Sequence, residues 1–228
     1  MANQYVIIVA GGVGKRMQTE LPKQFVQVCG KEIILHTIMR FLNFNPSLQI
    51  IISVHPDYYE LLKTLLAKHQ YGSIKIVHGG PTRFHSVKNA LDTINDLNTV
   101  VGIHDAARPF VSIDTISRCF NVAQQKGNAI PSIALHESIR EADDKGNKAV
   151  NRDRFRIIQT PQCFRVSDIK KAFELKFQES FTDDASVLEA AGGTINLVEG
   201  NEENIKITLP KDLLIAKTFI ENEQRRNM

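Results

Sequence analysis

The sequence predicts an α/β fold in which helices cover both faces of a mostly parallel sheet, giving a three-layer sandwich. Apolar, β-branched runs recur along the 228-residue chain, and amphipathic helical patterns separate them. Strands that alternate with helices form parallel βαβ units. A chain of this length can bury a core without disulfides or metals. We therefore expect one domain, residues 1–228.

Five short apolar runs are typical of strands that are covered on both faces. The first is Tyr5–Ala10, YVIIVA, which is followed directly by glycines. The next four occupy residues 48–54, 74–79, 99–105 and 128–135. A further strand is expected within TINLVEG, residues 194–200.

Helical periodicity fills the intervals between these strands. In residues 56–69, four leucines share one predicted face opposite to charged residues: Leu61, Leu62, Leu65 and Leu66. Residues 83–94 show a similar spacing, and another helix is expected to begin near residue 167. The expected boundary residues are Ser112 and Gly127 for one helix, Thr182 and Gly192 for a second, and Pro210 at the start of the last.

Charge, cysteines and hydropathy exclude several classes of protein. The chain has 28 Lys and Arg against 25 Asp and Glu, a net charge of +3, which does not indicate nucleic-acid binding. Its three cysteines are widely spaced, which favours reduced thiols over a disulfide framework or a zinc site. The N-terminus lacks the features of a signal peptide, and the apolar runs are too short to span a bilayer. We expect a soluble, cytoplasmic protein with no nucleic-acid or membrane partner.

Residues 136–154 interrupt the alternation of strands and helices. The segment is polar, carries the turn signal DDKGN and has no sustained period. We predict a protruding β-hairpin arm, for which a surface loop is the alternative. Arms of this kind are commonly buried in a partner subunit, so we expect a homodimer that forms through the arm.

The segment after the first strand, VAGGVGKRMQTELPKQF, is a candidate ligand-binding loop. It follows the carboxyl end of a strand, where α/β folds bind ligands. Its glycines allow backbone N–H groups to approach a phosphate chain closely. It does not fit a P-loop, because Val9 replaces the first glycine and Arg16 follows the lysine. It does not fit a dinucleotide fingerprint either, because Met17 replaces the third small residue.

Two cations of this loop are candidates for catalysis. Arg16 and Lys23 flank a short polar stretch that ends in Pro22, and a rigid turn there would direct both side chains over the glycines. Cations beside backbone donors suit a triphosphate whose α-phosphorus is attacked, because negative charge builds up on its oxygens. Lys15 is interpreted as a solvated surface charge.

Five sequence blocks, in this order, carry a family resemblance: AGGVGKRM with PKQF, HDAARPF, QTPQCF, TDDASVLE and EGNEENIKIT. Together they closely resemble the 2-C-methyl-D-erythritol 4-phosphate cytidylyltransferases, from Val6 to about Ala216. The resemblance implies a Rossmann-like nucleotidyltransferase sheet and a CTP-dependent reaction that requires Mg2+. In this reaction a polyol phosphate, methylerythritol phosphate, attacks the α-phosphorus of CTP and releases pyrophosphate, as a step of non-mevalonate isoprenoid biosynthesis.

The resemblance also assigns roles to the residues that match the family's motifs. Arg16 and Lys23 are expected to be the catalytic residues that stabilise the pentavalent transition state. The residues expected to bind the nucleotide are Ala10, Gly11, Gly12, Gly14, Gly79, Gly80, Arg83, Ser86 and Asp105. Asp105 is also the expected Mg2+ ligand, directly or through water, with a ribose hydroxyl as the alternative partner. Pro81 stands where the family often has an acidic residue.

A second group of residues is expected to position the polyol phosphate: Arg152, Lys206, Thr160, Thr182, Ser138 and Arg108. In the family, the arginine that matches Arg152 comes from the neighbouring subunit, which implies an active site shared across the dimer. Ser138 stands where the family often has threonine, and it keeps the hydroxyl. For Arg108, a structural ion pair is the alternative to a role at the site.

Three alternative functions are considered. Ribitol or ribulose phosphate cytidylyltransferases share the fold and the triphosphate chemistry, but HDAARPF and TDDASVLE fit the erythritol enzymes better. A non-catalytic nucleotide-binding domain would not need all four of Arg16, Lys23, Arg152 and Lys206. A nicotinamide dehydrogenase is disfavoured, because its glycine fingerprint is incomplete.

Overall fold

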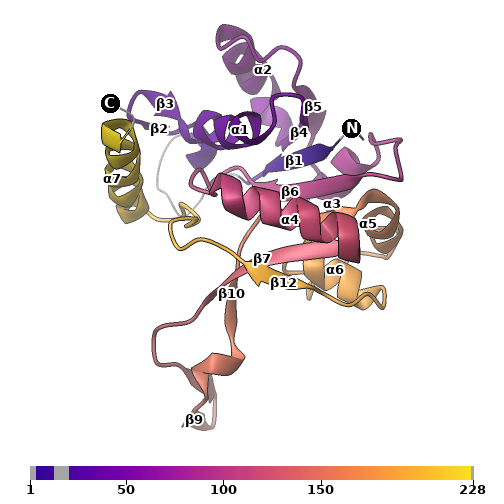
Figure 1. The fold of residues 1–228 in the computed structure, drawn as a ribbon, viewed down its shortest axis with the longest axis vertical. Coiled ribbons are helices and arrows are strands. Elements are labelled where there is room, and N and C mark those ends of the chain that lie inside the picture. Colours follow the sequence, from indigo (N-terminus) through magenta and orange to yellow (C-terminus); the bar gives the residue numbers. More distant parts are fainter. Residues whose placement is uncertain (1–3, 13–20, 227–228) are drawn as a thin grey trace.

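An eight-stranded sheet forms the centre of the molecule, and helices pack on both of its faces (Figure 1). The computed structural model describes residues 4–12 and 21–226. The strands follow the order β10-β7-β11-β6-β1-β4-β5, and β12 also pairs with β7. Their bounds are β1 (Tyr5–Ala10), β4 (Gln49–Val54), β5 (Lys75–His78), β6 (Val100–Asp105), β7 (Asn128–Ala134), β10 (Arg156–Ile158), β11 (Gln162–Arg165) and β12 (Leu197–Glu199).

The central strands pair in parallel, as the alternation of strands and helices predicts. β1 pairs with both β4 and β6, so that Ile7 lies between Ile51 and Ile103. All three side chains are buried, because helices cover both faces of the sheet. The six predicted strands all form within the predicted ranges. The predicted fold class, an α/β sandwich with a mostly parallel sheet, is confirmed.

Two strands run against the others, and the sequence does not predict them. β11 pairs antiparallel with both β6 and β7, and β10 pairs antiparallel with β7. They contain four and three residues, which is too short for a periodic pattern to identify them. The tertiary structure creates them: Phe164 of β11 is completely buried opposite Val101 of β6.

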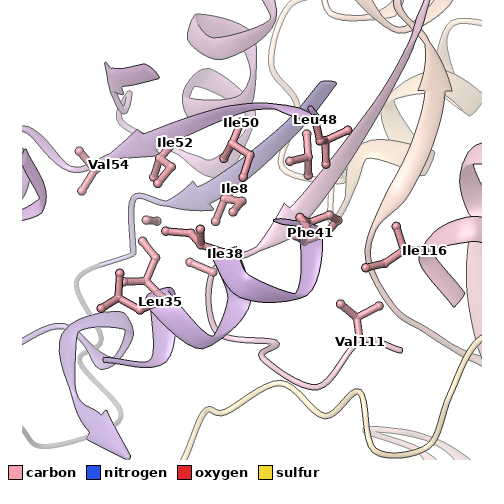
Figure 2. Packing of buried hydrophobic residues seen from close by; sticks show 14 of the residues in the cluster. Ile8, Leu35, Ile38, Phe41, Leu48, Ile50, Ile52, Val54, Val111 and Ile116 are labelled. Carbon is pink, nitrogen blue, oxygen red and sulfur yellow. The ribbon is translucent and has the colours of Figure 1, made fainter. Parts of the chain in front are cut away.

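One face of the sheet is covered by α1 (Ile33–Phe44), α2 (Tyr59–Lys68) and α4 (Ile113–Lys126). Figure 2 shows Ile38 of α1 directed toward Ile8 of β1 inside this cluster. Each fully buried aliphatic or aromatic side chain of this kind contributes about 1.5–3 kcal/mol to stability. The N-cap residue of α1, Glu32, makes no side-chain hydrogen bond to the helix.

The opposite face of the sheet is covered by α3 (Arg83–Leu91), α5 (Val166–Ala172) and α6 (Asp184–Ala190). Phe84 of α3 stacks on Phe173, which follows α5, with ring centroids 4.7 Å apart. The two helical layers and the sheet together make the predicted three-layer sandwich.

The C-terminal helix α7 (Pro210–Arg226) packs beside a small hairpin of β2 (Gln27–Val28) and β3 (Lys31–Glu32). A salt bridge of 2.5 Å between Arg40 of α1 and Glu223 links α7 to the body. In residues 4–12 and 21–226, no helix is both long and apolar enough to cross a membrane.

Three short 3-10 helices complete the secondary structure of the described residues: η2 (Lys23–Phe25), η3 (Pro56–Tyr58) and η4 (Arg152–Arg154). η2 precedes the β2–β3 hairpin, and η4 lies at the base of the arm described below. η2 carries Lys23 and η4 carries Arg152, two residues that the sequence assigns to the site.

Most helix boundaries stand where the sequence predicts them. The Ser112 hydroxyl accepts a hydrogen bond from an amide in the first turn of α4, and Gly127 ends that helix with φ of +92°. Gly192 follows the end of α6 with φ of +87°, a conformation that favours glycine. Pro210 is the first residue of α7, as predicted.

Two details of the helix predictions are wrong. Asp183, not Thr182, is the N-cap of α6, because the side chains of Asp183 and Ser186 each accept from the other's backbone amide in a capping box. Leu61, predicted on the buried face of α2, is 41% exposed. The helical step of 100° per residue puts the packed face on Leu62 and the leucines one turn later.

The predicted arm region contains a separate hairpin of β8 (Arg140–Asp143) and β9 (Gly146–Ala149), which projects from the body (Figure 1). All residues of both strands are exposed. Gly146 has φ of +144°, which a glycine tolerates at the start of the second strand. The hairpin is thus an extension without a core of its own.

One histidine lies inside the core. His104 of β6 is completely buried, and its ring meets the edge of Phe41 with centroids 4.9 Å apart. Its Nε2 lies 3.0 Å from the carbonyl oxygen of Arg108, which can only accept, so Nε2 carries the hydrogen. Nδ1 then accepts from the Thr160 hydroxyl at 2.9 Å. Burial lowers the pKa of His104 to about 4, so the ring is neutral near pH 7.

Replacing Gly127 with alanine should destabilise the protein. An L-amino acid at φ of +92° costs about 1–2 kcal/mol. The backbone cannot adopt another conformation here without changing the end of α4, because residue 127 is its C-cap. Urea unfolding of Gly127→Ala measures the loss. Gly72→Ala is the matched control: its added methyl group meets no atom within 4 Å and its φ is not in the left-handed region. Equal stabilities of the two variants would contradict the prediction.

Stability should fall as the pH is lowered from 7 to 5, in part because of His104. Between its unfolded pKa of 6.5 and its folded pKa of about 4, the unfolded chain binds a proton that the folded protein does not. This difference removes on the order of 2 kcal/mol over these two pH units. The measurement is unfolding free energy against pH, for the wild type and for His104→Gln. The wild type should lose more stability than the variant; parallel curves would refute the assignment.

Candidate active site

A cavity of about 480 Å3 opens at the carboxyl ends of β1 and β6. The crossover from β1 leads to β4 on one side, whereas the crossover from β5 returns past β1 to β6 on the other. Such a switch point in an open α/β sheet leaves a crevice in which ligands bind. Ala10 and Asp105, the last residues of the two strands, both line the cavity.

The segment after β1 forms one wall of the cavity. Ala10, Gly11 and Gly12 line it, together with Gln24 of η2. The Gln24 amide group donates to the carbonyl oxygens of Ala10 and Gly12, at 2.8 and 3.0 Å. The third expected glycine, Gly14, lies outside the described residues. The described part of the glycine segment is therefore held from behind by a buried side chain.

Lys23 lines the same cavity from η2. Its Nζ donates to the carbonyl oxygen of Ile207 at 2.8 Å. Pro22, with φ of −55°, precedes η2 and provides the rigid turn that the sequence predicts there. Arg16, the other expected catalytic residue, lies outside the described residues. The structure thus brings one of the two predicted cations to the glycine segment.

A turn before α3 forms the facing wall. Gly80 and Ser86 line the cavity, and the Ser86 hydroxyl accepts from the Gly80 amide and donates to the Thr82 carbonyl, both at 3.0 Å. A β-carbon on Gly80 would approach His85 to 2.4 Å, so the turn needs a glycine there. Gly79 is not part of the cavity wall. The predicted base-recognition stretch therefore contributes Gly80 and Ser86, with Gly79 behind them.

Three cations surround the Asp105 carboxylate on the cavity wall. Its oxygens lie 2.8 Å from Nζ of Lys206, 3.4 Å from Nε of Arg108 and 3.6 Å from Nε of Arg83. Burial by itself would raise the pKa of Asp105, but the three positive charges outweigh it and hold the pKa far below its usual range. Asp105 is therefore ionised throughout the physiological pH range.

Arg83 is fixed by a second, deeper carboxylate. Its guanidinium donates to both oxygens of Asp184 at 2.8 and 2.6 Å, and Asp184 is completely buried in the first turn of α6. Burial opposes the charge on Arg83, but the ion pair with Asp184 raises its pKa above the usual value. The Gln162 side chain donates to Asp183 and accepts from the Ala185 amide, so it holds the start of α6 in place.

Thr160 lies behind Asp105 and is not part of the cavity wall. Its hydroxyl accepts from the Asp105 amide at 3.1 Å and donates to His104. The Asn204 side chain donates to the Thr160 carbonyl, and Arg108 donates to the Asn204 carbonyl, both at 2.8 Å. Thr160 and Arg108 therefore support Asp105 from the protein side, and Arg108 makes the structural ion pair that was its alternative role.

Three residues expected at the polyol phosphate lie away from the cavity of their own chain. Arg152, on η4 at the base of the arm, is exposed and donates to the His136 carbonyl. Ser138 and Thr182 are also exposed. None of the three lines the cavity, whereas Lys206 does. Their assignment to the second substrate stays a prediction that requires another subunit or a movement of the chain.

Mg2+ fits this cavity only with help from a ligand. Among the described residues there is no cluster of three or more His, Cys, Asp or Glu that could hold a metal. Mg2+ typically keeps several waters and binds through one or two carboxylates plus substrate phosphates. One ionised carboxylate, Asp105, faces the cavity, which is the kind of donor set that such a phosphate-bound ion needs.

Sequence reasoning missed Gln24 and Asp184. Gln24 stands in the PKQF block, but an uncharged amide next to a lysine does not suggest that it is buried against the backbone. Asp184 is interpreted only as an acid in the first turn of a helix. A signal existed, because the apolar residues that follow it indicate a buried helix start, where a carboxylate needs a cationic partner.

Comparison with known proteins agrees with this geometry. The chain matches the family model described as 2-C-methyl-D-erythritol 4-phosphate cytidylyltransferase over residues 4–222. Proteins of that name from Bacteroides thetaiotaomicron and Bacteroides fragilis are 44% and 45% identical to it. The alignments cover 95% and 94% of this chain and 99% and 98% of the two relatives.

Solved structures show the same fold over almost the whole chain. The 4-diphosphocytidyl-2C-methyl-D-erythritol synthase of Anaerococcus prevotii matches with a TM-score of 0.82 and 26% identity, covering 96% of both chains. The 2-C-methyl-D-erythritol 4-phosphate cytidylyltransferase of Francisella tularensis matches with a TM-score of 0.74 and 33% identity, over 94% of this chain and 98% of that one. This protein has the family's sequence pattern and fold, and its cavity lies at residues that match the family's motifs. The chain belongs to the 2-C-methyl-D-erythritol 4-phosphate cytidylyltransferase family.

Proposed function

We propose that this chain transfers the cytidylyl group of CTP to the phosphate of 2-C-methyl-D-erythritol 4-phosphate, and that the cavity between β1 and β6 is the place of transfer. It is a CTP-dependent nucleotidyltransferase of non-mevalonate isoprenoid biosynthesis. The products are 4-diphosphocytidyl-2-C-methyl-D-erythritol and pyrophosphate. The observation that carries the proposed site is the convergence of Lys23, Arg83 and Lys206 on one cavity beside a glycine backbone. Family membership favours this substrate over ribitol or ribulose phosphate.

The chemistry needs electrostatic stabilisation and alignment more than proton transfer. An oxygen of the polyol phosphate forms a bond to the α-phosphorus of CTP, and the bond from that phosphorus to the bridging oxygen of pyrophosphate breaks. The nucleophile is already an anion, so no general base is required. Two anions must instead be held in line, which fixed cations make possible. Lys23 is placed for this role on the cavity wall, and Arg16 is assigned to it by the family motif.

The nucleotide end of the cavity has glycine backbone on two sides. Gly11 and Gly12 belong to one wall, and Gly80 with the buried Ser86 belongs to the other. A β-carbon on Gly11 would meet the Ser86 hydroxyl at 3.0 Å, so the two walls are close together at this point. We assign this narrow end to cytosine and the ribose, and the wider cationic part to the phosphates.

Lys206 is placed to receive the second substrate. Without a ligand it forms an ion pair with Asp105 at 2.8 Å, and its side chain is 40% exposed. An incoming phosphate would compete with Asp105 for this partly solvated ammonium group. Arg83, held by Asp184, would stay in place during this exchange. Lys206 is therefore the more exposed cation of the cavity, and Arg83 the one with two carboxylate partners.

Asp105 is the residue that we assign to Mg2+. Asp105 would hold the ion, which would supply additional positive charge for the phosphates of CTP. Arg83 and Arg108 keep the Asp105 carboxylate ionised, and the Thr160 hydroxyl accepts a hydrogen bond from the backbone amide of Asp105.

The remaining polyol phosphate ligands are assigned to a second subunit. Arg152 and Ser138 belong to the arm, which projects from the body (Figure 1). Neither residue lines the cavity of its own chain. Phe155 and Ile157, just after η4, are 46% and 43% exposed. A homodimer in which each arm covers the partner would bury these side chains. We place the enzyme in the cytoplasm, with CTP and the polyol phosphate as its partners.

Lys23→Ala should lower kcat by about 10²–10³-fold, or about 2.7–4 kcal/mol in the barrier, because one fixed charge is lost at the phosphates. Pyrophosphate release from CTP, in the presence of methylerythritol phosphate and Mg2+, measures the rate. Lys211→Ala is the control, since it removes the same charge from an exposed position in the first turn of α7. Turnover of Lys23→Ala within threefold of the control would exclude Lys23 from catalysis.

Mixing two inactive variants tests the shared site. A heterodimer of Lys23→Ala and Arg152→Ala contains one site with both intact residues only if the arm of one subunit completes the cavity of the other. After unfolding and refolding of an equal mixture, random pairing should restore about a quarter of the wild-type activity. Arg154→Ala is the control for Arg152→Ala, because it removes the same charge from the same short helix. No recovery above the separate variants would place Arg152 in its own subunit's site or outside the site.

A further inference from the structure

We propose that Gln24 is a positioning residue that clamps the base of the nucleotide loop, and that CTP binding depends on its two amide hydrogens. Gln24 belongs to η2, directly after Lys23, and it is only 2% exposed although it lines the cavity. A polar side chain at a cavity wall that is so fully buried must satisfy its hydrogen bonds within the protein. The inference rests on the proposed function, since it names CTP as the ligand.

The hydrogen-bond partners define the clamp. Nε2 of Gln24 lies 2.8 Å from the Ala10 carbonyl oxygen and 3.0 Å from the Gly12 carbonyl oxygen. Both partners can only accept, so the nitrogen must face them, and the reversed amide would place an oxygen against two oxygens. One side-chain group therefore uses both of its hydrogens on carbonyls two residues apart in the chain.

This pair of bonds determines how the glycine segment presents its backbone. In a trans peptide the N–H points opposite to the C=O. When Gln24 holds the Ala10 carbonyl, it also fixes the direction of the Gly11 amide in the cavity wall. Glycines have the widest choice of backbone conformations, so without a clamp the segment would sample many of them. The entropy of ordering it would then be lost on binding CTP.

The clamp also couples the loop to the catalytic lysine. Lys23 and Gln24 are neighbours on η2, and Lys23 donates to the Ile207 carbonyl next to Lys206. η2 itself is held by a hydrogen bond of 2.8 Å from the Phe25 amide to the Pro22 carbonyl. A single short turn thus joins the end of β1 and the glycine segment to the strip of chain that carries Lys206.

Two substitutions separate clamping from packing. Gln24→Met keeps the length and apolar bulk of the side chain but donates no hydrogen bond. Gln24→Glu keeps the shape but turns an oxygen toward the two carbonyls, and it adds a negative charge near the triphosphate. Both carbonyls lose their partner in each variant. Gln27→Met is the matched control: Gln27 is exposed, lies three residues later, and its side chain donates to the Glu32 carboxylate.

The experiment measures the Kd of CTP with Mg2+ by calorimetry in the absence of the second substrate, and then KM for both substrates. Gln24→Met should weaken CTP binding about tenfold, the equivalent of one lost hydrogen bond, and Gln24→Glu should weaken it further. KM for methylerythritol phosphate should stay within twofold of wild type, and Gln27→Met should match wild type throughout. A residue that merely supports packing would not produce this split between the substrates.

Several results would overturn the inference. One is a Kd for CTP within twofold of wild type in Gln24→Met; another is an equal rise of KM for both substrates. Thermal unfolding identifies variants that do not fold, and if Gln24→Met fails this check, the uncharged Gln24→Leu, which also donates no hydrogen bond, takes its place. The proposed function fails separately, if the wild type binds CTP but releases no pyrophosphate with methylerythritol phosphate. In that case the calorimetric comparison still tests the clamp.

Discussion

The ion cluster around the Asp105 carboxylate is the interaction on which the site depends. Removing a carboxylate from water costs several kcal/mol, and this cost is offset only by close, well-oriented cations. Lys206, Arg108 and Arg83 supply them. The Asp105 carboxylate in turn holds these three positive charges at one edge of the sheet. With Asp184, the second partner of Arg83, the cluster holds three cations and two carboxylates, an excess of one positive charge.

The cations of this cluster differ in how firmly they are held. Arg83 has a second, completely buried partner in Asp184, so its guanidinium stays in one place. Arg108 is tied to the Asn204 carbonyl and lies behind the carboxylate. Lys206 is the most exposed of the three and makes the shortest contact with Asp105. An anionic substrate can therefore take Lys206 as its partner, while Arg83 and Arg108 keep their contacts with the protein.

The sheet explains why these groups meet. Parallel strands end at the same edge, so the residue after β1 and the last residue of β6 come together although about a hundred positions separate them in the chain. β11 then runs in the opposite direction beside β6 and brings Thr160 behind Asp105. The charge of the chain as a whole is only +3, so the attraction for two anionic substrates is a local property of this edge.

The alternation of strands and helices, the glycine segment and the cavity residues Lys23, Arg83, Asp105 and Lys206 can be predicted from the sequence. Apolar periodicity is local, and a strand such as Tyr5–Ala10 can be identified from its own residues. The sequence does not predict that β11 inserts antiparallel, that Asp184 pairs with Arg83 or that Gln24 faces two carbonyls. These features depend on contacts between segments that are distant in the chain. Their energies come from desolvation and geometry, which no single stretch of residues contains.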